Sequence, residues 1–233
     1  MVGKSLKKWW PVFVLPTLAA FIIGFLWPFI WGIYLSFCKF STVKDVVWVG
    51  LSNYQKIFIG GDFSHAFWLT VVFAFVSSIL INVLAFSIAL ALTKGFKGTN
   101  VFRTVFFMPN LIGGIVLGYV WQFVFNNVLI KMTNNISLLS KTNTAMMAII
   151  VVYIWQYAGY IMLIYVTGLT QVPKDVLEAS QIDGANAVTT LFKIKIPMIA
   201  ATITICTFLT LTSAFKQFDV NMALTNGTGS VAS

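Results

Sequence analysis

Charged side chains are scarce in this chain. Only 9% of its 233 residues are Asp, Glu, Lys or Arg, whereas a soluble globular domain carries about 25%. Hydrophobic residues make up 59%, which leaves too little polar surface to cover a soluble core. The composition therefore excludes an ordinary soluble domain and indicates an integral membrane protein.

Residue types that carry catalysis or bind metals are also rare. His65 is the only histidine and lies in a loop, so a membrane-embedded enzyme built on a His/Asp/Glu cluster is disfavoured. Cys38 and Cys206 form no CxxC pair and are expected to be small buried hydrophobes. The phosphate-cradle pattern G-x-x-x-x-G-K-[ST] is absent, so any ATP hydrolysis must come from a partner.

Basic residues outnumber acidic ones and give a net charge of +9. In a soluble domain this excess would suggest a nucleic-acid partner. Beside membrane spans, Lys and Arg instead set the orientation of the chain and meet anionic lipid headgroups. We therefore expect membrane lipid, and no nucleic acid, among the partners.

Five apolar stretches are long enough to cross about 30 Å of hydrocarbon as helices of about 20 residues. They cover approximately residues 11–37, 67–92, 105–125, 145–169 and 198–222. The sequence thus predicts an all-α polytopic membrane protein with a single transmembrane domain over residues 1–233. The first stretch lacks an A-x-A-like end and is too long for a signal-peptide core, so a retained span is expected.

The basic residues divide the loops between the two sides of the membrane. The N-terminus and the loops 93–104 and 170–197 carry nine Lys or Arg, against five in the loops 38–66 and 126–144. The first group is therefore predicted to be cytoplasmic, with the N-terminus inside. An odd number of spans would leave the C-terminus outside, so a sixth span is expected beyond the end of this chain.

The 170–197 loop is unusually polar for its position between two long apolar runs. Pro173 suits the first position of a short helix, and Asp175 favours its early turns. Gly184 supplies a left-handed stop. A second short helix would then carry an apolar stripe of Val188, Leu191 and Phe192 at helical spacing. Two interpretations stay open from periodicity alone: a pair of helices lying among lipid headgroups, or a docking element for a cytoplasmic partner.

The same loop resembles a known motif. Permease subunits of binding-protein-dependent ABC importers carry a cytoplasmic EAA loop with the pattern E-A-A, three residues, G, nine residues, then I-x-L-P. The stretch "EASQIDGANAVTTLFKIKIP" follows that spacing and departs from it only at Ser180 and Ile196. Matching positions are Glu178, Ala179, Asp183, Gly184, Ala185, Ile194 and Pro197. The resemblance implies that these residues couple the chain to an ATPase, with Glu178 holding the docked helix and Gly184 permitting the turn.

Other segments resemble the carbohydrate branch of that family, similar to the larger permease subunit of the maltose transporter. They include "VGLSNYQKIF", "FRTVFFMPNLIGGIVLGYVWQFVF" and "FKQFDVNMALTNG". The resemblance implies the type I ABC importer permease fold in a bacterial cell membrane. It also implies a heterodimer with a second related permease, two copies of a cytoplasmic ATPase, an extracellular solute-binding protein and a sugar substrate. No cofactor is expected on this chain, because ATP and Mg²⁺ would bind the partner ATPase.

Polar groups at membrane depth are candidates for a sugar pathway, because lipid offers them no hydrogen-bond partner. Amides and hydroxyls suit sugar hydroxyls, and aromatic rings suit the apolar faces of a sugar. The predicted pathway residues are Asn110, Trp121, Gln122, Tyr153, Gln156, Tyr160, Lys216 and Asp219. Gln217 and Asn221 are further polar residues at the end of the fifth stretch.

Each pathway candidate has a simpler structural alternative. The aromatic residues could anchor the chain at the lipid interface or pack between helices. Lys216 and Asp219 could form an internal i,i+3 ion pair. Gly114 and Gly118 form a G-x-x-x-G that predicts a close helix contact.

Two other function classes remain as rivals. An ABC importer for another solute, such as an amino acid or phosphate, is the closest alternative. A secondary transporter or channel would need ion-coupling carboxylates or inverted repeats. All six acids lie in loops or in the last helical stretch, which disfavours that second class.

Overall fold

A computed structural model of the chain describes residues 2–42, 45–95, 97–130, 139 and 142–225. These residues are almost entirely helical, which confirms the predicted all-α class. The chain divides into two compact units, Met1–Ser64 and His65–Ser233. That residues 1–233 act as one transmembrane domain stays a prediction.

Three helices are long and apolar enough to cross a membrane, and two bent helix pairs raise the number to five if each pair is one span. The three straight spans are Trp9–Ser36, Phe63–Leu92 and Asn143–Thr170. They agree with the first, second and fourth predicted stretches. The two bent pairs fall on the third and fifth.

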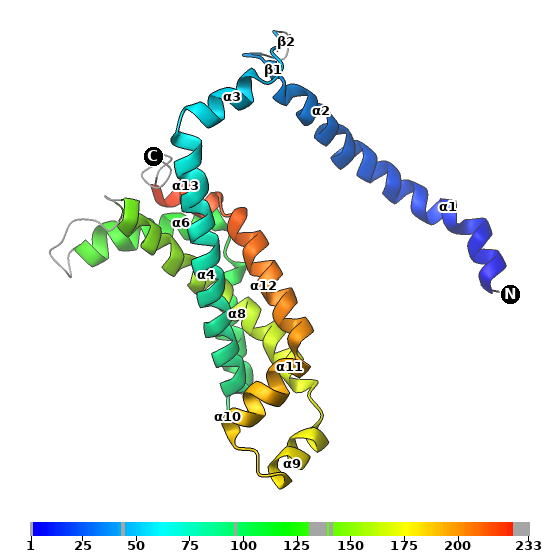
Figure 1. Ribbon diagram of the computed structural model, residues 1–233, viewed down its shortest axis with the longest axis vertical. Helices are drawn as coiled ribbons and strands as arrows, with labels where there is room; N and C mark the ends of the chain where they lie inside the picture. Colours follow the sequence, from blue (N-terminus) through cyan, green and yellow to red (C-terminus); the bar gives the residue numbers. More distant parts are fainter. Residues whose placement is uncertain (1, 43–44, 96, 131–138, 140–141, 226–233) are drawn as a thin grey trace. The chain divides into compact units, whose positions relative to one another are not determined.

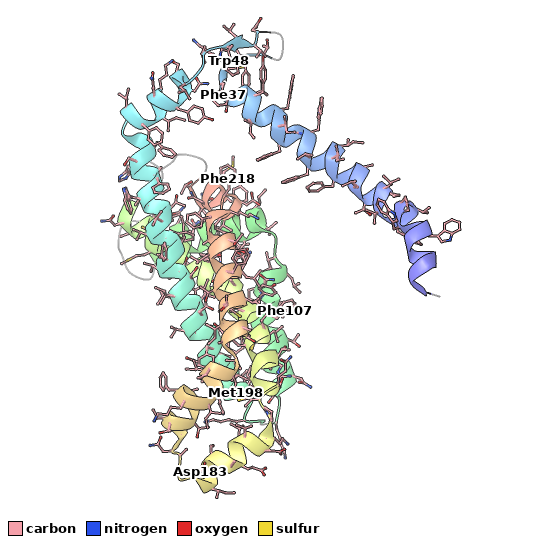
Figure 2. All side chains as sticks on the ribbon, turned by 45° about the vertical axis from the view of Figure 1, so that its right-hand side comes forward. Phe37, Trp48, Phe107, Asp183, Met198 and Phe218 are labelled. Atoms are coloured by element: carbon pink, nitrogen blue, oxygen red, sulfur yellow. The ribbon has the colours of Figure 1, made fainter. Side chains whose placement is uncertain are left out.

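The first unit is a long helical run followed by two short strands, a short helix and a small cluster of aromatic side chains. Its elements are α1 (Val2–Phe21), η1 (Ile22–Leu26), α2 (Trp27–Ser36), β1 (Cys38–Lys39), β2 (Val47–Trp48) and α3 (Ser52–Ile59). The two strands pair antiparallel, with Cys38 opposite Trp48. The ring centre of Phe37 lies 5.4 Å from that of Trp48 and 5.5 Å from that of Tyr54. Figure 2 shows Phe37 and Trp48 side by side at this turn.

The second unit is a helical bundle with a hairpin at one end (Figure 1). Its elements are α4 (Asp62–Leu92), α5 (Thr99–Phe107), η2 (Met108–Leu111), α6 (Gly114–Phe123), η3 (Val124–Leu129), α8 (Thr142–Thr170), α9 (Lys174–Ile182), α10 (Ala187–Thr190), η5 (Leu191–Lys195), α11 (Ile196–Met198), α12 (Ala200–Phe215) and α13 (Asp219–Thr225). Helices α4, α8 and α12 share one hydrophobic core, which includes Ile81, Tyr153, Ile161 and Cys206.

The third predicted span, 105–125, is broken rather than continuous. Pro109 sits in the 3₁₀ turn η2, and Ile112 and Gly113 are extended, so α6 leaves at 96° to the helix before it. Proline removes a backbone donor and clashes with the preceding turn, which explains why the helix does not continue. The change of direction at this break is sharper than a kink within one continuous helix.

The fifth predicted span, 198–222, is shorter than expected. Helix α12 ends at Phe215 and α13 restarts at Asp219. Lys216 is the C-cap residue of α12, so Lys216 and Asp219 do not share a helix. The i,i+3 ion pair that a continuous helix would have allowed is not formed between these two described residues.

Close packing of the described helices relies on glycine at several interfaces, including that of α8 with α5 and that of α6 with α13. A Cβ on Gly159 of α8 would collide with the backbone of Phe106 and Phe107 in α5. A Cβ on Gly118 of α6 would lie 2.5 Å from the Cβ of Ala223 in α13. The close contact predicted from the G-x-x-x-G pattern is thus confirmed, and its partner is α13 of the same chain.

A buried polar network joins the three core helices. Asn82 of α4 donates to the Thr210 hydroxyl of α12 over 3.0 Å, and Tyr165 of α8 donates to the Asn82 side-chain oxygen over 2.7 Å. Tyr153 of α8 donates to the Thr210 carbonyl over 3.0 Å. Since lipid cannot satisfy these groups, the network fixes how α4, α8 and α12 pack against one another.

Candidate functional site

The first candidate site is the hairpin formed by residues 174–198, called here the α9–α11 hairpin. Its first arm is α9, preceded by Pro173 at the N-cap, one position earlier than predicted. The arm ends in a Schellman turn: Gly184 N–H donates to the Gln181 carbonyl over 3.0 Å and Ala185 N–H to the Ser180 carbonyl over 2.9 Å. Gly184 has φ +78°, so the predicted left-handed stop is confirmed.

The second arm begins with a capped turn and ends in a bend. Asn186 caps α10 by accepting a hydrogen bond from the Thr189 N–H over 2.8 Å. The arm then passes through the π-helical turn η5 and the short α11, which contains Pro197. At the buried Ile199 the chain bends by 72° into α12. The predicted second helix is therefore confirmed as one continuous helical run, Ala187–Met198, with a π-helical turn in its middle.

The outer surface of the hairpin is exposed and chemically mixed. Ile182, Val188 and Phe192 are 86%, 64% and 62% exposed, so the hairpin presents large apolar side chains on its outer surface. Glu178 is also exposed, and it makes no hydrogen bond or ion pair with any described residue. Figure 2 shows Asp183 at the tip of the hairpin, away from the bundle, and Met198 where the hairpin joins it. Such a surface can enter a groove that offers apolar walls and a donor for one carboxylate.

The motif residues take different places on this hairpin. Ala179, Asp183, Gly184 and Pro197 are exposed, whereas Ala185 and Ile194 are half-buried. A Cβ added at Gly184 would meet nothing within 4 Å, so the backbone angle and not crowding requires glycine there.

The inner side of the hairpin is fixed to the bundle. Val172, just before α9, and Ile199, just after α11, are both buried in the core shared by α4, α8 and α12. Ser180, one of the two departures from the motif, is 6% exposed and donates its hydroxyl hydrogen to the Leu177 carbonyl over 2.7 Å. A force on the hairpin would therefore be transmitted to α8 and α12.

The second candidate site lies at the opposite end of α12. Two cavities of about 240 and 220 Å³ flank the break between α12 and α13, and Gln217 lines both of them; we call them the amide cavities. The larger is bounded by α4, α8 and α12, with Thr70, Phe73 and Asn221 in its lining. The smaller is lined by Gly114, Gln156, Tyr157, Ser213, Lys216, Gln217, Asp219 and Val220. Figure 2 shows Phe218, which lines the larger cavity, far along the second unit from Asp183.

Three amides that line these cavities have a buried polar atom without a partner. They are Oε1 of Gln156, Nε2 of Gln217 and Oδ1 of Asn221. The Gln156 side chain is only 6% exposed, and its Nε2 makes a long 3.4 Å hydrogen bond to the Ile112 carbonyl at the break in the third span. Leaving a buried donor or acceptor unpaired is unfavourable, so a ligand that brings hydroxyl or amide groups would supply the missing partners.

The predicted pathway residues only partly converge. Gln156, Lys216 and Asp219 line the smaller amide cavity. Tyr153 is fully buried and serves the polar network, while Gln122 donates to the Leu224 carbonyl of α13 over 3.0 Å. Other candidates lie outside the linings of the two amide cavities: Trp121, which packs edge-on against Trp155, and the half-buried Asn110 and Tyr160. Roles in transport for all eight residues stay predictions.

Sequence reasoning missed the residues that hold the bundle together by hydrogen bonds. Asn82, Tyr165 and Thr210 were not singled out, although Asn82 stands within the apolar run "ILINVLAF". The rule applied to Asn110 and Gln156, that lipid gives an amide no partner, also identifies Asn82. Ser213, beside Lys216 in the smaller cavity, carried no such signal because serine is common in helix interfaces.

Comparison with known proteins supports the fold and identifies the family. Residues 81–233 match the family model described as "Binding-protein-dependent transport system inner membrane component". The chain is 37% identical to the probable starch degradation products transport system permease protein AmyD of Thermoanaerobacterium thermosulfurigenes, over 94% of this chain and 77% of that protein. It is 26% identical to the trehalose/maltose transport system permease protein MalF of Thermococcus litoralis, over 92% of this chain and 76% of that protein.

A solved structure has the same fold. It is the crystal structure of a bacterial ABC transporter involved in the import of the acidic polysaccharide alginate, and one of its chains superposes with a TM-score of 0.75. The alignment covers 99% of this chain and 90% of that one at 19% identity, a level that supports the fold alone. The resemblance to ABC importer permeases is thereby confirmed: this multi-pass membrane protein belongs to the family of binding-protein-dependent transport system inner membrane components.

Proposed function

We propose that this chain is the transmembrane permease subunit of an ATP-driven sugar importer, with oligosaccharides as its substrate class. It would form half of the translocation pathway, and a cytoplasmic ATPase would act on it through the α9–α11 hairpin. The observation that carries the proposal is the hairpin itself: an exposed motif on a rigid turn, attached through Val172 and Ile199 to the helices that border the amide cavities.

Coupling follows from that attachment. The outer surface offers Glu178 and three exposed apolar side chains to a groove on the partner ATPase. The inner ends of the hairpin continue into α8 and α12. Closure of an ATPase dimer would displace the hairpin and tilt both helices, which would change access to the amide cavities. ATP and Mg²⁺ would remain on the ATPase, so this chain would transport without being an enzyme.

Sugar as the substrate is supported by the names of the relatives, which refer to starch degradation products and to trehalose and maltose. The amide cavities agree with this chemistry, because an amide pairs with a hydroxyl as donor or acceptor. An importer of another solute, such as an amino acid, is the alternative. Uptake of labelled maltodextrins, challenged with unlabelled sugars and amino acids, separates the two. Competition by amino acids but not sugars would favour the alternative.

The first experiment tests coupling with a matched pair of substitutions in α9. Glu178→Lys should abolish sugar uptake and solute-stimulated ATP hydrolysis while the chain reaches the membrane in normal amount. Asp175→Lys makes the same charge reversal one turn earlier, outside the motif, and should leave most uptake intact. Normal uptake and normal ATPase recovery with Glu178→Lys would contradict the docking role.

The second experiment tests the assembly. We propose that the transporter contains one copy of this chain, one copy of a different related permease and two ATPase copies, and that an extracellular solute-binding protein delivers sugar to it. Mass measurement of the purified complex decides the permease stoichiometry. Two copies of this chain with no second permease would overturn the heterodimer.

The orientation of the chain is part of the same proposal. The nine basic residues of the N-terminus and of the loops 93–104 and 170–197 support placing these segments in the cytoplasm. Cysteines introduced into the loop 93–104 should resist membrane-impermeant thiol reagents in intact cells and react after permeabilisation. Labelling in intact cells would contradict this orientation.

A further inference from the structure

A third cavity lies at the hairpin end of the second unit, apart from the amide cavities. It has a volume of about 670 Å³, and the ends of α4 and α8 form one side of it while α9, α10 and η5 form the other. We call it the lysine cavity. Its volume falls in the range of about 300–1,000 Å³ that is typical of small-molecule sites.

The lining of this cavity is divided between cations and hydrocarbon. Three lysines, Lys94, Lys174 and Lys195, line it together with the hydroxyl residues Thr93 and Thr170. Most of the remaining lining is aliphatic: Leu90, Leu169, Val172, Leu177, Ala187 and Leu191. None of the described lining residues is acidic. The cavity therefore combines a strongly basic part with an apolar wall.

None of the three lysines forms an ion pair with a described residue. The acids closest in sequence to Lys174 are Asp175 and Glu178, which are exposed and do not line the cavity. Three ammonium groups around one cavity repel one another, and a bound anion would remove that repulsion. Lysine ammonium groups are also common phosphate ligands.

The place of the cavity along the helices identifies the source of the anion. It lies where α4 and α8, two of the three straight membrane-crossing helices, come to their ends near Leu92 and Thr170. Helix ends of this kind lie near the lipid headgroups, and basic pockets between membrane helices bind anionic headgroups. A free phosphate would leave the aliphatic wall in water, whereas lipid acyl chains would cover it.

We propose that the lysine cavity binds an anionic phospholipid, with the headgroup phosphate among Lys94, Lys174 and Lys195 and the acyl chains along the aliphatic wall. The outer surface of the hairpin, with Ile182, Val188 and Phe192, does not line this cavity and stays free for a protein partner. The lipid would then connect the ends of α4 and α8 to the hairpin.

Native mass spectrometry of the delipidated complex that contains the full chain tests the proposal. The complex is titrated with phosphatidylglycerol and, separately, with phosphatidylcholine of the same acyl chains. Each lysine near a headgroup contributes about 1 kcal/mol, so each should strengthen binding of the anionic lipid about fivefold. Replacing all three by Gln should remove the preference for phosphatidylglycerol.

A matched pair of single variants keeps the test independent of the hairpin. Lys94→Gln alters the cavity at the end of α4, whereas Lys97→Gln alters a lysine of the same loop that does not line it. We expect about fivefold weaker phosphatidylglycerol binding for Lys94→Gln and no change for Lys97→Gln. Equal effects of the two variants, or equal binding of the two lipids by the unaltered complex, would overturn the proposal.

Competition with soluble anions distinguishes lipid from free phosphate. Inorganic phosphate and glycerol phosphate carry the headgroup chemistry without acyl chains. If they displace phosphatidylglycerol at comparable concentrations, the cavity is a soluble-anion site and the lipid assignment is wrong. If they fail to displace it, the aliphatic wall contributes to binding as proposed.

Discussion

The α9–α11 hairpin and the amide cavities differ in how the sequence specifies them. The hairpin depends on local features: a Schellman turn at Gly184, an N-cap at Asn186 and exposed side chains in a fixed order. The amide cavities depend on residues far apart in the chain, such as Gly114, Gln156 and Gln217, which meet only after two spans break. One site is thus encoded by spacing and the other by packing.

This difference has a mechanical consequence. The local hydrogen bonds of the hairpin would preserve its shape if the hairpin were displaced as a unit. The amide cavities change shape whenever the helices that line them shift, because each wall belongs to a different element. A hairpin that keeps its shape, together with cavities that change shape, would convert a displacement of the hairpin into altered access of a ligand to the cavities.

The largest expected effect comes from adding a side chain at a glycine of the helical bundle, compared with the same change at a glycine of the hairpin. Gly159→Leu places side-chain atoms where the backbone of Phe106 lies, so α5 and α8 must move apart. Overpacking of this kind costs about 3 kcal/mol or more. We expect little assembled transporter in the membrane, measured by immunoblot and by detergent gel filtration.

Gly184→Leu serves as the matched control, because a Cβ at Gly184 meets open space. The chain should reach the membrane in near-normal amount even though coupling is impaired. Comparable losses of assembled protein for both variants would show that the hairpin and the bundle do not differ in their tolerance of an added side chain.

The next effect tests whether the backbone angle at Gly184 or the mere absence of a side chain matters. A left-handed conformation costs roughly 1–2 kcal/mol for most L-residues but is tolerated by Asn. Gly184→Asn should therefore retain much of the uptake, whereas Gly184→Val should lose more than about tenfold. Uptake rates at equal membrane abundance provide the measurement. Equal uptake by the two variants would indicate that the turn geometry is not required.

Much of the fold could be predicted from the sequence, and the reasons can be stated by element. Long apolar runs identified the spans that become α4 and α8, and Gly184 identified the turn of the hairpin. The breaks after Leu111 and Phe215 were harder to locate, because both lie inside apolar stretches long enough to be read as continuous spans. Pro109 lies just before the first break, while the second has no proline and is marked only by the polar stretch that starts at Lys216.

The two candidate sites also differ in how far they could be predicted from the sequence. Seven motif positions could be assigned from their spacing alone, although their coupling role stays a prediction. Which polar side chains face a cavity could not be assigned, because it depends on helix rotation. Gln156 faces a cavity, while Tyr153, only three residues earlier, is fully buried in the core.

A smaller effect should come from the polar network of the bundle. Tyr165→Phe removes the 2.7 Å hydrogen bond to Asn82 and leaves the Asn82 side-chain oxygen without that donor. Hydrogen bonds between membrane helices are worth about 0.6 kcal/mol on average and up to about 1.7 kcal/mol. The midpoint of thermal unfolding of the purified complex should fall by a few degrees. Tyr119→Phe, at an exposed position, should leave the unfolding midpoint unchanged. A larger shift of the midpoint for Tyr119→Phe than for Tyr165→Phe would contradict the stabilising role assigned to the polar network.

The smallest effect concerns the amide cavities and the proposed sugar pathway. Gln156→Leu keeps the volume of the side chain but removes the unpaired Oε1 that faces the smaller cavity. One lost hydrogen bond to a bound sugar costs about 0.5–1.5 kcal/mol, which corresponds to roughly threefold to tenfold weaker affinity. Because the hairpin is untouched, basal ATP hydrolysis of the assembled complex should persist. Asn110→Leu should also impair uptake, but less, since the two amide cavities do not include Asn110 in their linings. Transport assays over a range of sugar concentrations separate affinity from rate. If both leucine variants keep the original affinity and rate, the sugar does not contact these amides, and Lys216 and Asp219 at the break between α12 and α13 become the residues to test next.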